Sequence, residues 1–176
     1  MVEIGTHFGR STRRLIDMQE VLGLSYHVEC YDVIDRVQFF DRDREATLHL
    51  EDVTGRVSEL LLNRYGEGVI FLDARPRRLI EDLVAAVRDD ASGKWALVVH
   101  DCGRGLYNEA MGEIDDDAIS SNTGVWERHV VAAAFDREPA GALHGARRND
   151  HVLEVLETRH GLGIVVPVAR SGSGHS

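Results

Sequence analysis

The sequence predicts a single α/β domain, with a mostly parallel sheet of seven strands and helices on both of its faces. Short apolar runs alternate with amphipathic stretches of helical period, which is the pattern of βαβ units. Two of these runs, 69–72 and 95–99, are apolar throughout, as expected for parallel strands that are buried on both faces. A chain of 176 residues suits one such domain, which we place at 1–170, followed by a flexible Gly/Ser-rich tail at 171–176.

The first half of the chain is predicted to alternate strands with helices. After the first strand, Ser11 or Thr12 can cap a helix that ends at Gly23. A second helix carries the leucines at 60–62 and closes at Gly66. The four strands of this half are expected at 2–4, 26–31, 46–50 and 69–72.

The second half continues the alternation with less regular spacing. Apolar residues at helical spacing predict a helix over 79–87. A loop over 102–123 contains glycines and the acidic run Asp115-Asp116-Asp117. Further helices are expected at 125–135 and 152–157, and strands at 95–99, near 140–144 and at 164–168.

Composition restricts the classes of partner. Thirty acidic against twenty basic residues give a formal charge of -10, which disfavours nucleic acid and anionic membranes and leaves a small-molecule partner. Neither a membrane-spanning run nor a secretory leader is present, so we expect a soluble, cytoplasmic protein. Cys30 and Cys102 both lie in predicted strands and are expected to be reduced packing residues.

The first candidate site is the turn after the first strand, in the sequence Glu3-Ile-Gly5-Thr-His-Phe-Gly9-Arg-Ser11. Glycines at positions 5 and 9 allow a sharp turn and a close approach of backbone and ligand. The helix that follows offers unpaired N–H groups at its start. This combination is typical of a nucleotide-like cofactor site.

Acidic residues follow several predicted strands. Asp32, Asp52, Asp73 and Asp101 each stand where a strand ends. Because ligands of open parallel sheets bind outside the carboxyl ends of the strands, we expect these acids to converge on one crevice. Asp32 lies 23 positions after Gly9 (32 − 9), close to the spacing at which a carboxylate accepts hydrogen bonds from a ribose diol.

These motifs, in this order, resemble those of the class I S-adenosylmethionine-dependent methyltransferases. They are most similar to the small-molecule O-methyltransferase branch that contains macrocin O-methyltransferase-like and cephalosporin hydroxylase-like proteins. The resemblance extends from residue 2 to residue 168. It rests on the glycine turn, the strand-end acids, and the runs Val69-Ile-Phe-Leu-Asp73, Val98-Val-His-Asp101, Gly124-Val125 and Gly161-Leu-Gly163.

The resemblance implies a Rossmann-like methyltransferase domain that binds S-adenosylmethionine. It implies that the glycine turn holds the methionine part of the cofactor, that Asp32 binds the ribose and that Asp52 binds the adenine amino group. Asp73 would face the sulfonium and the acceptor. The residues assigned to the cofactor are Glu3, Gly5, Gly9, Ser11, Asp32, Asp52 and Asp73.

Catalysis is assigned to Asp73, His100 and Asp101. Related enzymes place a histidine base soon after the fourth-strand acid, and this chain does not, so His100 is the nearest candidate and His144 a weaker one. Asp73 and Asp101 are also candidate ligands of a divalent metal. The third ligand of metal-dependent relatives is replaced by Cys102, a poor partner for Mg²⁺, which leaves metal dependence open.

Two alternatives remain beside a small-molecule methyltransferase acting on a hydroxyl. Relatives normally carry a segment before the glycine turn, which is apparently lacking here. Either the chain is a shortened form, or a second subunit completes the cleft in a homo-oligomer or a complex, or the cleft is more open than usual. The same feature favours a catalytically silent binding module. An NAD-dependent oxidoreductase fits the fold. It is disfavoured because the turn lacks the G-x-G-x-x-G spacing that a pyrophosphate requires.

Overall fold

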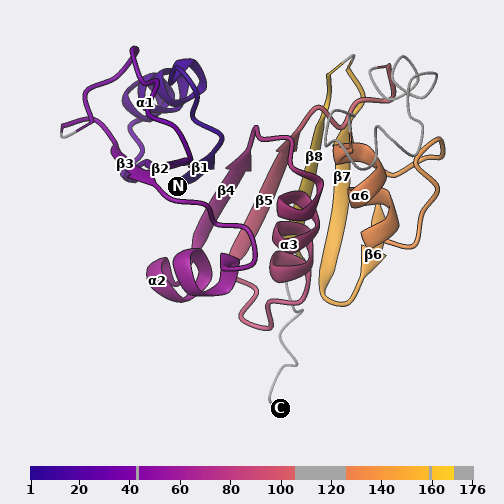
Figure 1. Cartoon of the computed structure of the whole chain (residues 1–176). Coiled ribbons are helices and arrows are strands. Elements are labelled where there is room, and N and C mark those ends of the chain that lie inside the picture. The colour runs from indigo at the N-terminus through magenta and orange to yellow at the C-terminus, as the bar shows by residue number, and fades with distance from the viewer. Residues whose placement is uncertain (43, 106–125, 159, 169–176) are drawn as a thin grey trace.

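The computed structural model of the protein describes residues 1–42, 44–105, 126–158 and 160–168. In this part of the chain, eight strands form one sheet in the order β3-β2-β1-β4-β5-β8-β7-β6 (Figure 1). Neighbours from β3 to β5 are parallel, and the last three strands pair antiparallel. The strands are β1 (Val2–Ile4), β2 (Glu29–Asp32), β3 (Thr47–Leu50), β4 (Gly68–Leu72), β5 (Trp95–His100), β6 (Ala146–Arg148), β7 (His151–Leu156) and β8 (Leu162–Pro167).

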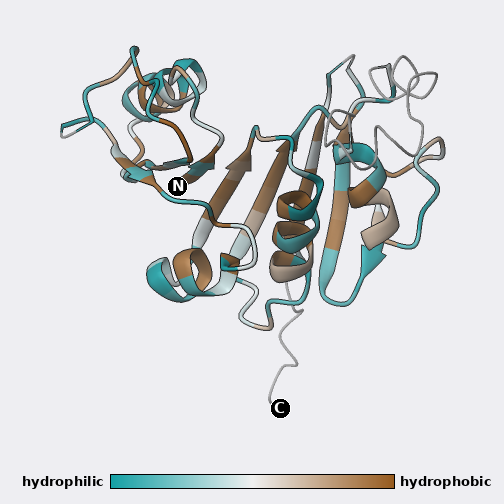
Figure 2. Ribbon diagram, in the orientation of Figure 1, coloured by the Kyte–Doolittle hydropathy of each residue, from teal (hydrophilic) through white to brown (hydrophobic). Residues whose placement is uncertain are grey.

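Helices pack on both faces of the sheet, as predicted. On one face, apolar residues of α3 and α6 join those of the central strands in the larger core; Figure 2 shows these strands as mainly hydrophobic. On the other face, α1 buries Ile16 against Val28 and Cys30 in a smaller core. The helices are α1 (Arg10–Leu22), the π-helical segment η1 (Ser58–Leu62) that continues into α2 (Asn63–Tyr65), α3 (Arg77–Arg88) and α6 (Glu127–Ala134).

The predicted helix over 152–157 is wrong, because this segment is strand β7. Buried His151, Leu153 and Val155 alternate with less buried neighbours, and this period of two is that of a strand. A two-residue turn, with Asn149 at a φ of 52°, joins β7 to β6. The apolar residues of the segment are therefore explained by burial on one face of a sheet.

The predicted strand near 140–144 is also wrong. This segment is a loop, and the short strand β6 begins only at Ala146. The second strand starts at Glu29 and not at residue 26, because its pairing with β1 begins where Val2 meets Glu29. A sheet of eight strands replaces the expected seven, while the mostly parallel α/β class is confirmed.

The strand order places the candidate site at a reversal of chain direction across the sheet. From β1 the chain moves outward to β2 and β3, and it returns to β4 on the other side of β1. The crevice outside the carboxyl ends of β1 and β4 is where ligands of such sheets bind. No helix among the described residues has the length and apolar character to cross a membrane. The predictions at 106–125 and 171–176, including Asp115, Asp116 and Asp117, lie outside the described residues.

Candidate functional site

The turn after β1 is held by the chain itself. Gly5 has a φ of 89° and Gly9 a φ of 83°, conformations that favour glycine. A Cβ at position 5 would clash with the carbonyl oxygen of Asp73, and one at position 9 would lie 2.7 Å from the ring of Phe40. Gly5 N–H donates to the carbonyl oxygen of Tyr31 at 3.0 Å. Gly5 therefore allows the turn to pack against the end of β4, and Gly9 allows it to pack against Phe40.

Glu3 lies beneath this turn and outside the crevice. Its side chain is fully buried, where a carboxylate oxygen accepts a hydrogen bond from the Thr12 hydroxyl and lies 3.7 Å from the Cys30 sulfur. Burial raises the pKa of Glu3, and its other carboxylate oxygen has no hydrogen-bond partner. Glu3 thus ties β1 to α1, and its predicted contact with a cofactor would be indirect.

Asp32 closes the outer side of the turn. Its carboxylate accepts the backbone N–H of His7 at 2.8 Å and that of Ile34 at 3.1 Å. Large apolar side chains next to it, at the ends of β2 and β3, remain exposed: Val33, Ile34 and Leu50. Asp32 therefore stands between the glycine turn and an apolar rim.

Asp52 is not brought to this turn by any contact among the described residues. Its carboxylate accepts the backbone N–H of Thr54 at 2.9 Å, and this hydrogen bond lowers its pKa. β3, which precedes Asp52, is an edge strand two positions from β1 in the sheet. A contact from Asp52 to an adenine ring stays a prediction.

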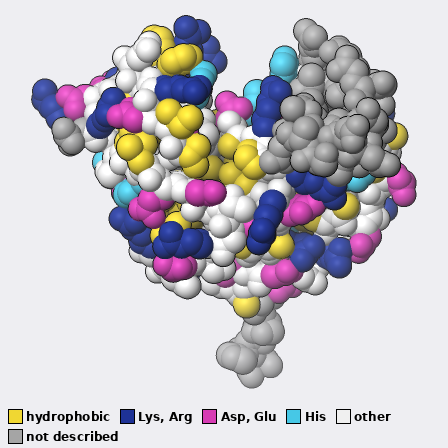
Figure 3. All heavy atoms as spheres, in the orientation of Figure 1, with side chains coloured by type: hydrophobic (Ala, Val, Ile, Leu, Met, Phe, Trp, Pro, Cys, Tyr) yellow, Lys and Arg dark blue, Asp and Glu magenta, His cyan; other side chains and the backbone are white. Residues whose placement is uncertain are grey.

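One cavity of about 660 Å³ lies at the carboxyl ends of the strands. The space-filling view shows a hollow in this region, with basic side chains and histidines on both of its sides (Figure 3). Three parts of the chain line it: the glycine turn with α1, the ends of β4 and β5, and the segment before β8. The lining residues are Gly5, Thr6, His7, Phe8, Arg10, Ser11, Arg14, Leu15, Phe71, Asp73, His100, Thr158, His160, Gly161 and Leu162.

Four side chains meet at the inner end of this cavity, and we call them the strand-end cluster: Asp73, His100, Asp101 and His160. Nδ1 of His100 lies 3.3 Å from Oδ1 of Asp73 and 3.2 Å from Oδ1 of Asp101. Nδ1 of His160 lies 2.8 Å from the same Asp101 oxygen, and the two imidazole rings stack with centroids 5.9 Å apart. The structure therefore brings all three predicted catalytic residues together.

Charge and burial perturb this cluster. The nearby Asp73 carboxylate raises the pKa of His100, assisted by the charge of Asp101 and opposed by burial. Behind the cluster, burial raises the pKa of Glu127 to about 7, with further repulsion from Asp101 and Asp73. Asp101 itself has a φ of 62°, and such strained non-glycine conformations concentrate at functional sites.

The strand-end cluster has the donor atoms of a divalent metal site. One ligand atom each from Asp73, His100 and Asp101 lies within 4.8 Å of the other two. Nδ1 of His100 is buried and lacks a hydrogen bond, although both carboxylates lie near it. Cys102, which replaces the third ligand of metal-dependent relatives, is buried in the core. His100 supplies the third donor, so the residues present fit a divalent cation.

Sequence reasoning missed His160 and overvalued His144. His144 is exposed, pairs with Glu154 and does not line the cavity. His160 reaches Asp101 only because β8 inserts beside β5 as its antiparallel neighbour. The Gly161-Leu162-Gly163 sequence was noticed, but no local pattern shows which strand it will adjoin.

Comparison with known proteins supports the fold. No protein-family profile and no curated protein matches the chain. A protein of known structure from Corynebacterium glutamicum is 13% identical with a TM-score of 0.58, over 97% of this chain and 73% of that one. A SAM-dependent methyltransferase from Anabaena variabilis is 11% identical with a TM-score of 0.49, over 94% and 76%.

The structure of cmcI-D160 Mg-SAM is 17% identical with a TM-score of 0.48. It is matched over 96% of this chain, which spans 64% of the length of that one. At these identities the likenesses concern the fold. The likeness to the Corynebacterium glutamicum protein and the strand order together define a Rossmann-like α/β fold, and the cavity lies at the switch point of the sheet.

Proposed function

We propose that the chain is an S-adenosylmethionine-dependent methyltransferase that acts on a hydroxyl group of a small molecule. The observation that carries this proposal is the meeting of the glycine turn with Asp73 and His100, at the ends of β4 and β5, around one cavity at the switch point of the sheet. A sulfonium cation favours a crevice with carboxylates in its wall, and Asp73 lies there. The ordered sequence motifs resemble those of the same class.

The residues of the crevice can be assigned to parts of the cofactor. Asp32 would accept the ribose hydroxyls, and the apolar rim at Val33 and Leu50 offers a surface for the adenine ring. Gly5 and Ser11 line the cavity where the methionine part would lie, and Asp73 lines it beside Gly5. In this arrangement a bound cofactor would have its methyl group near the strand-end cluster.

Methyl transfer needs two reactants in line more than it needs a nucleophile from the protein. The cavity would hold the acceptor beside Asp73 and His100, and the strand-end cluster is positioned to take the hydroxyl proton. A divalent cation, if held by Asp73, His100 and Asp101, would lower the pKa of the acceptor hydroxyl. A homo-oligomer or partner subunit that covers the cavity would exclude water from the reaction.

Calorimetry with S-adenosylmethionine and S-adenosylhomocysteine tests the cofactor. We expect both compounds to bind. Asp32→Asn should lower the affinity for each of them at least tenfold, because the ribose diol loses its charged hydrogen-bond acceptor. Asp136→Asn, which alters a carboxylate paired with Arg148 elsewhere on the surface, is the control. A folded protein that binds neither compound would exclude the proposal.

A catalytically silent binding module is the second candidate. His100 supports it, because the neighbouring carboxylates raise its pKa and favour the imidazolium, which is no base. This candidate predicts cofactor binding without turnover on any acceptor, with or without Mg²⁺ or Mn²⁺. Transfer of a labelled methyl group to any hydroxyl compound would reject it.

A further inference from the structure

Two arginines of α1 line the cavity and have no acidic partner in the part of the chain that the structure describes. Arg10 and Arg14 lie one helical turn apart and line the cavity together with Ser11. Their neighbour Arg13 pairs with Asp17 instead. Among the described residues, no carboxylate lies within ion-pair distance of Arg10 or Arg14, in a protein whose formal charge is -10. Two cations without partners in a cavity wall favour an anion in that cavity.

Local structure keeps these arginines available to a ligand. The guanidinium carbon of Arg10 lies 5.0 Å from the centre of the Phe39 ring. Stacking uses one face of the guanidinium and leaves its N–H edge free to donate. α1 begins at Arg10 with no capping side chain and no acidic residue in its first turn, so the helix dipole adds positive potential on the same side.

The same cavity also has an acidic group in its wall. Asp73 lines it at the end of β4, and Oδ1 of Asp101, at the end of β5, lies 3.2 Å from Nδ1 of His100. A ligand that satisfies both the arginines and Asp73 carries an anionic group toward α1 and a cationic or hydroxyl group toward the strand-end cluster. The two kinds of charge in the cavity wall thus restrict the chemistry of the ligand.

We propose that Arg10 and Arg14 bind a carboxylate, or an oxyanion of similar size, on the ligand of this cavity. The identity of that ligand rests on the proposed function. The anion has two sources there: the carboxylate in the methionine part of the cofactor, or an anionic group on the acceptor. The planar guanidinium edge matches a carboxylate with two parallel hydrogen bonds.

The double variant Arg10→Gln/Arg14→Gln separates these sources. S-adenosylhomocysteine carries the carboxylate, whereas 5′-methylthioadenosine lacks the whole amino-acid part. If the cofactor supplies the anion, the double variant lowers the affinity for S-adenosylhomocysteine about tenfold or more and leaves the affinity for methylthioadenosine unchanged. Arg44→Gln, which removes an exposed arginine outside this cavity, is the control for a loss of positive charge elsewhere on the surface.

Inorganic phosphate probes the other source. If the acceptor supplies the anion, phosphate binds protein saturated with S-adenosylhomocysteine at low ionic strength, shifting the side-chain NMR signals of both arginines, and the double variant abolishes this binding. The inference is overturned if the double variant changes neither S-adenosylhomocysteine affinity nor phosphate binding more than Arg44→Gln does. If the wild-type protein binds no S-adenosylhomocysteine, the proposed function fails, while phosphate titration of the free protein still tests the arginine pair.

Discussion

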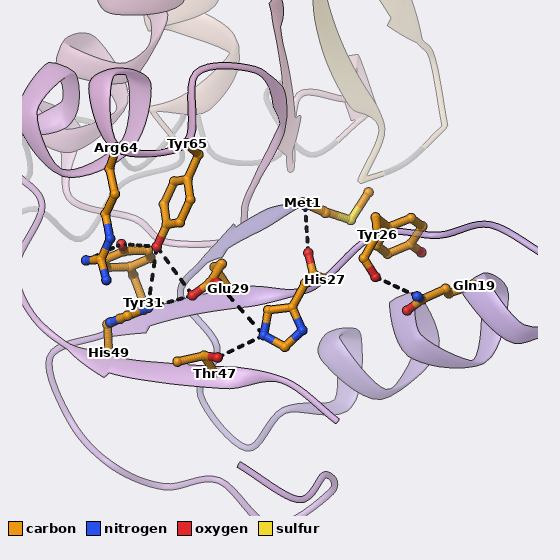
Figure 4. Close-up of polar contacts among 10 residues, drawn as sticks. All are labelled: Met1, Gln19, Tyr26, His27, Glu29, Tyr31, Thr47, His49, Arg64 and Tyr65. Atoms are coloured by element: carbon orange, nitrogen blue, oxygen red, sulfur yellow. Dashed lines mark hydrogen bonds and ion pairs between the residues drawn. The ribbon is translucent and has the colours of Figure 1, made fainter. Parts of the chain in front are cut away.

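Two clusters of histidine, acid and neighbouring polar groups lie in the same sheet and differ in how completely they are bonded. One is the strand-end cluster in the cavity. The other, which we call the edge network, joins β2 and β3 to α2 (Figure 4). It consists of Glu29, Tyr31, His49 and Tyr65.

The edge network is closed. The Tyr31 and Tyr65 hydroxyls lie 2.8 Å apart, and Nε2 of His49 lies 2.7 Å from the Glu29 carboxylate, which also accepts from Tyr65 at 3.3 Å. The His49 ring stacks on Tyr31 with centroids 4.5 Å apart. No side-chain polar atom of these four residues is both buried and unbonded. Each group has a partner in the network, so the network stabilises an edge of the sheet.

The strand-end cluster is open. Nδ1 of His100 and an oxygen of Glu127 behind it are buried without a hydrogen bond, and the cluster borders a cavity. Leaving such atoms unbonded costs free energy, which an added cation or ligand can recover. The difference shows that residue type alone does not identify a site. Unused bonding capacity next to a cavity is the informative feature.

Gly5→Ala should produce the largest effect, because it separates the glycine turn from the strand-end cluster. A Cβ would clash with the carbonyl oxygen of Asp73 at a positive φ of 89°. We expect a loss of about 3 to 5 kcal/mol in the free energy of unfolding, from the combined steric and backbone costs. Gly23→Ala is the control: its φ is 62° with no atom within 4 Å, so only about 1 to 2 kcal/mol should be lost. Equal losses in urea unfolding would contradict this account.

Glu127→Gln, behind the strand-end cluster, should change the pH dependence of folding stability. Burial raises the pKa of Glu127 from 4.5 to about 7, so the folded state binds this proton more tightly than the unfolded state. The protonated Glu127 side chain therefore contributes fully to folding stability below pH 4.5, and this contribution is lost as the pH rises to 7. Ionisation costs up to about 3 kcal/mol at pH 8, which the variant recovers. Unfolding measured from pH 5 to pH 8 should show a flatter profile for the variant; parallel profiles would refute the assignment.

Tyr65→Phe should remove two hydrogen bonds of the edge network, those of the Tyr65 hydroxyl with Tyr31 and with Glu29. The buried hydroxyl of Tyr31 loses a close partner, and we expect a loss of about 1 to 2 kcal/mol in unfolding free energy. A double-mutant cycle with Tyr31→Phe should give a coupling of about 1 kcal/mol, because the two hydroxyls bond each other. Cofactor affinity should stay unchanged. A coupling near zero would mean that the network does not act as a unit.

The sequence was sufficient for those features that depend on local pattern or on consecutive parallel strands. Apolar runs predicted β4 and β5, and because these strands pair in parallel, Asp73 and Asp101 end at the same edge of the sheet, as expected. The turn at Gly5 was recognisable from composition. The proposed role of Asp52 came from its position after β3, but β3 lies at the edge of the sheet, two strands from the turn.

The failures concern the last three strands. The apolar residues in β7 suit a helix about as well as a strand when periodicity is read over six positions. The antiparallel insertion of β8 between β5 and β7 is a property of the whole sheet. His160 joins the strand-end cluster only through that insertion, so the residue that completes the site could not be assigned beforehand.

His160→Gln and His49→Gln compare one histidine from each cluster, and their expected effects on stability are the smallest. The side chain of His160 is 56% exposed and that of His49 is 13% exposed, although each lies within 2.8 Å of a carboxylate. We expect His160→Gln to change unfolding free energy by less than about 0.5 kcal/mol, and His49→Gln to cost about 1 kcal/mol or more. Binding of Mn²⁺ or S-adenosylhomocysteine should respond only to His160→Gln, because His160 lines the cavity and His49 does not. If the two variants exchanged these effects, the open cluster would be the structural one and the closed network the site.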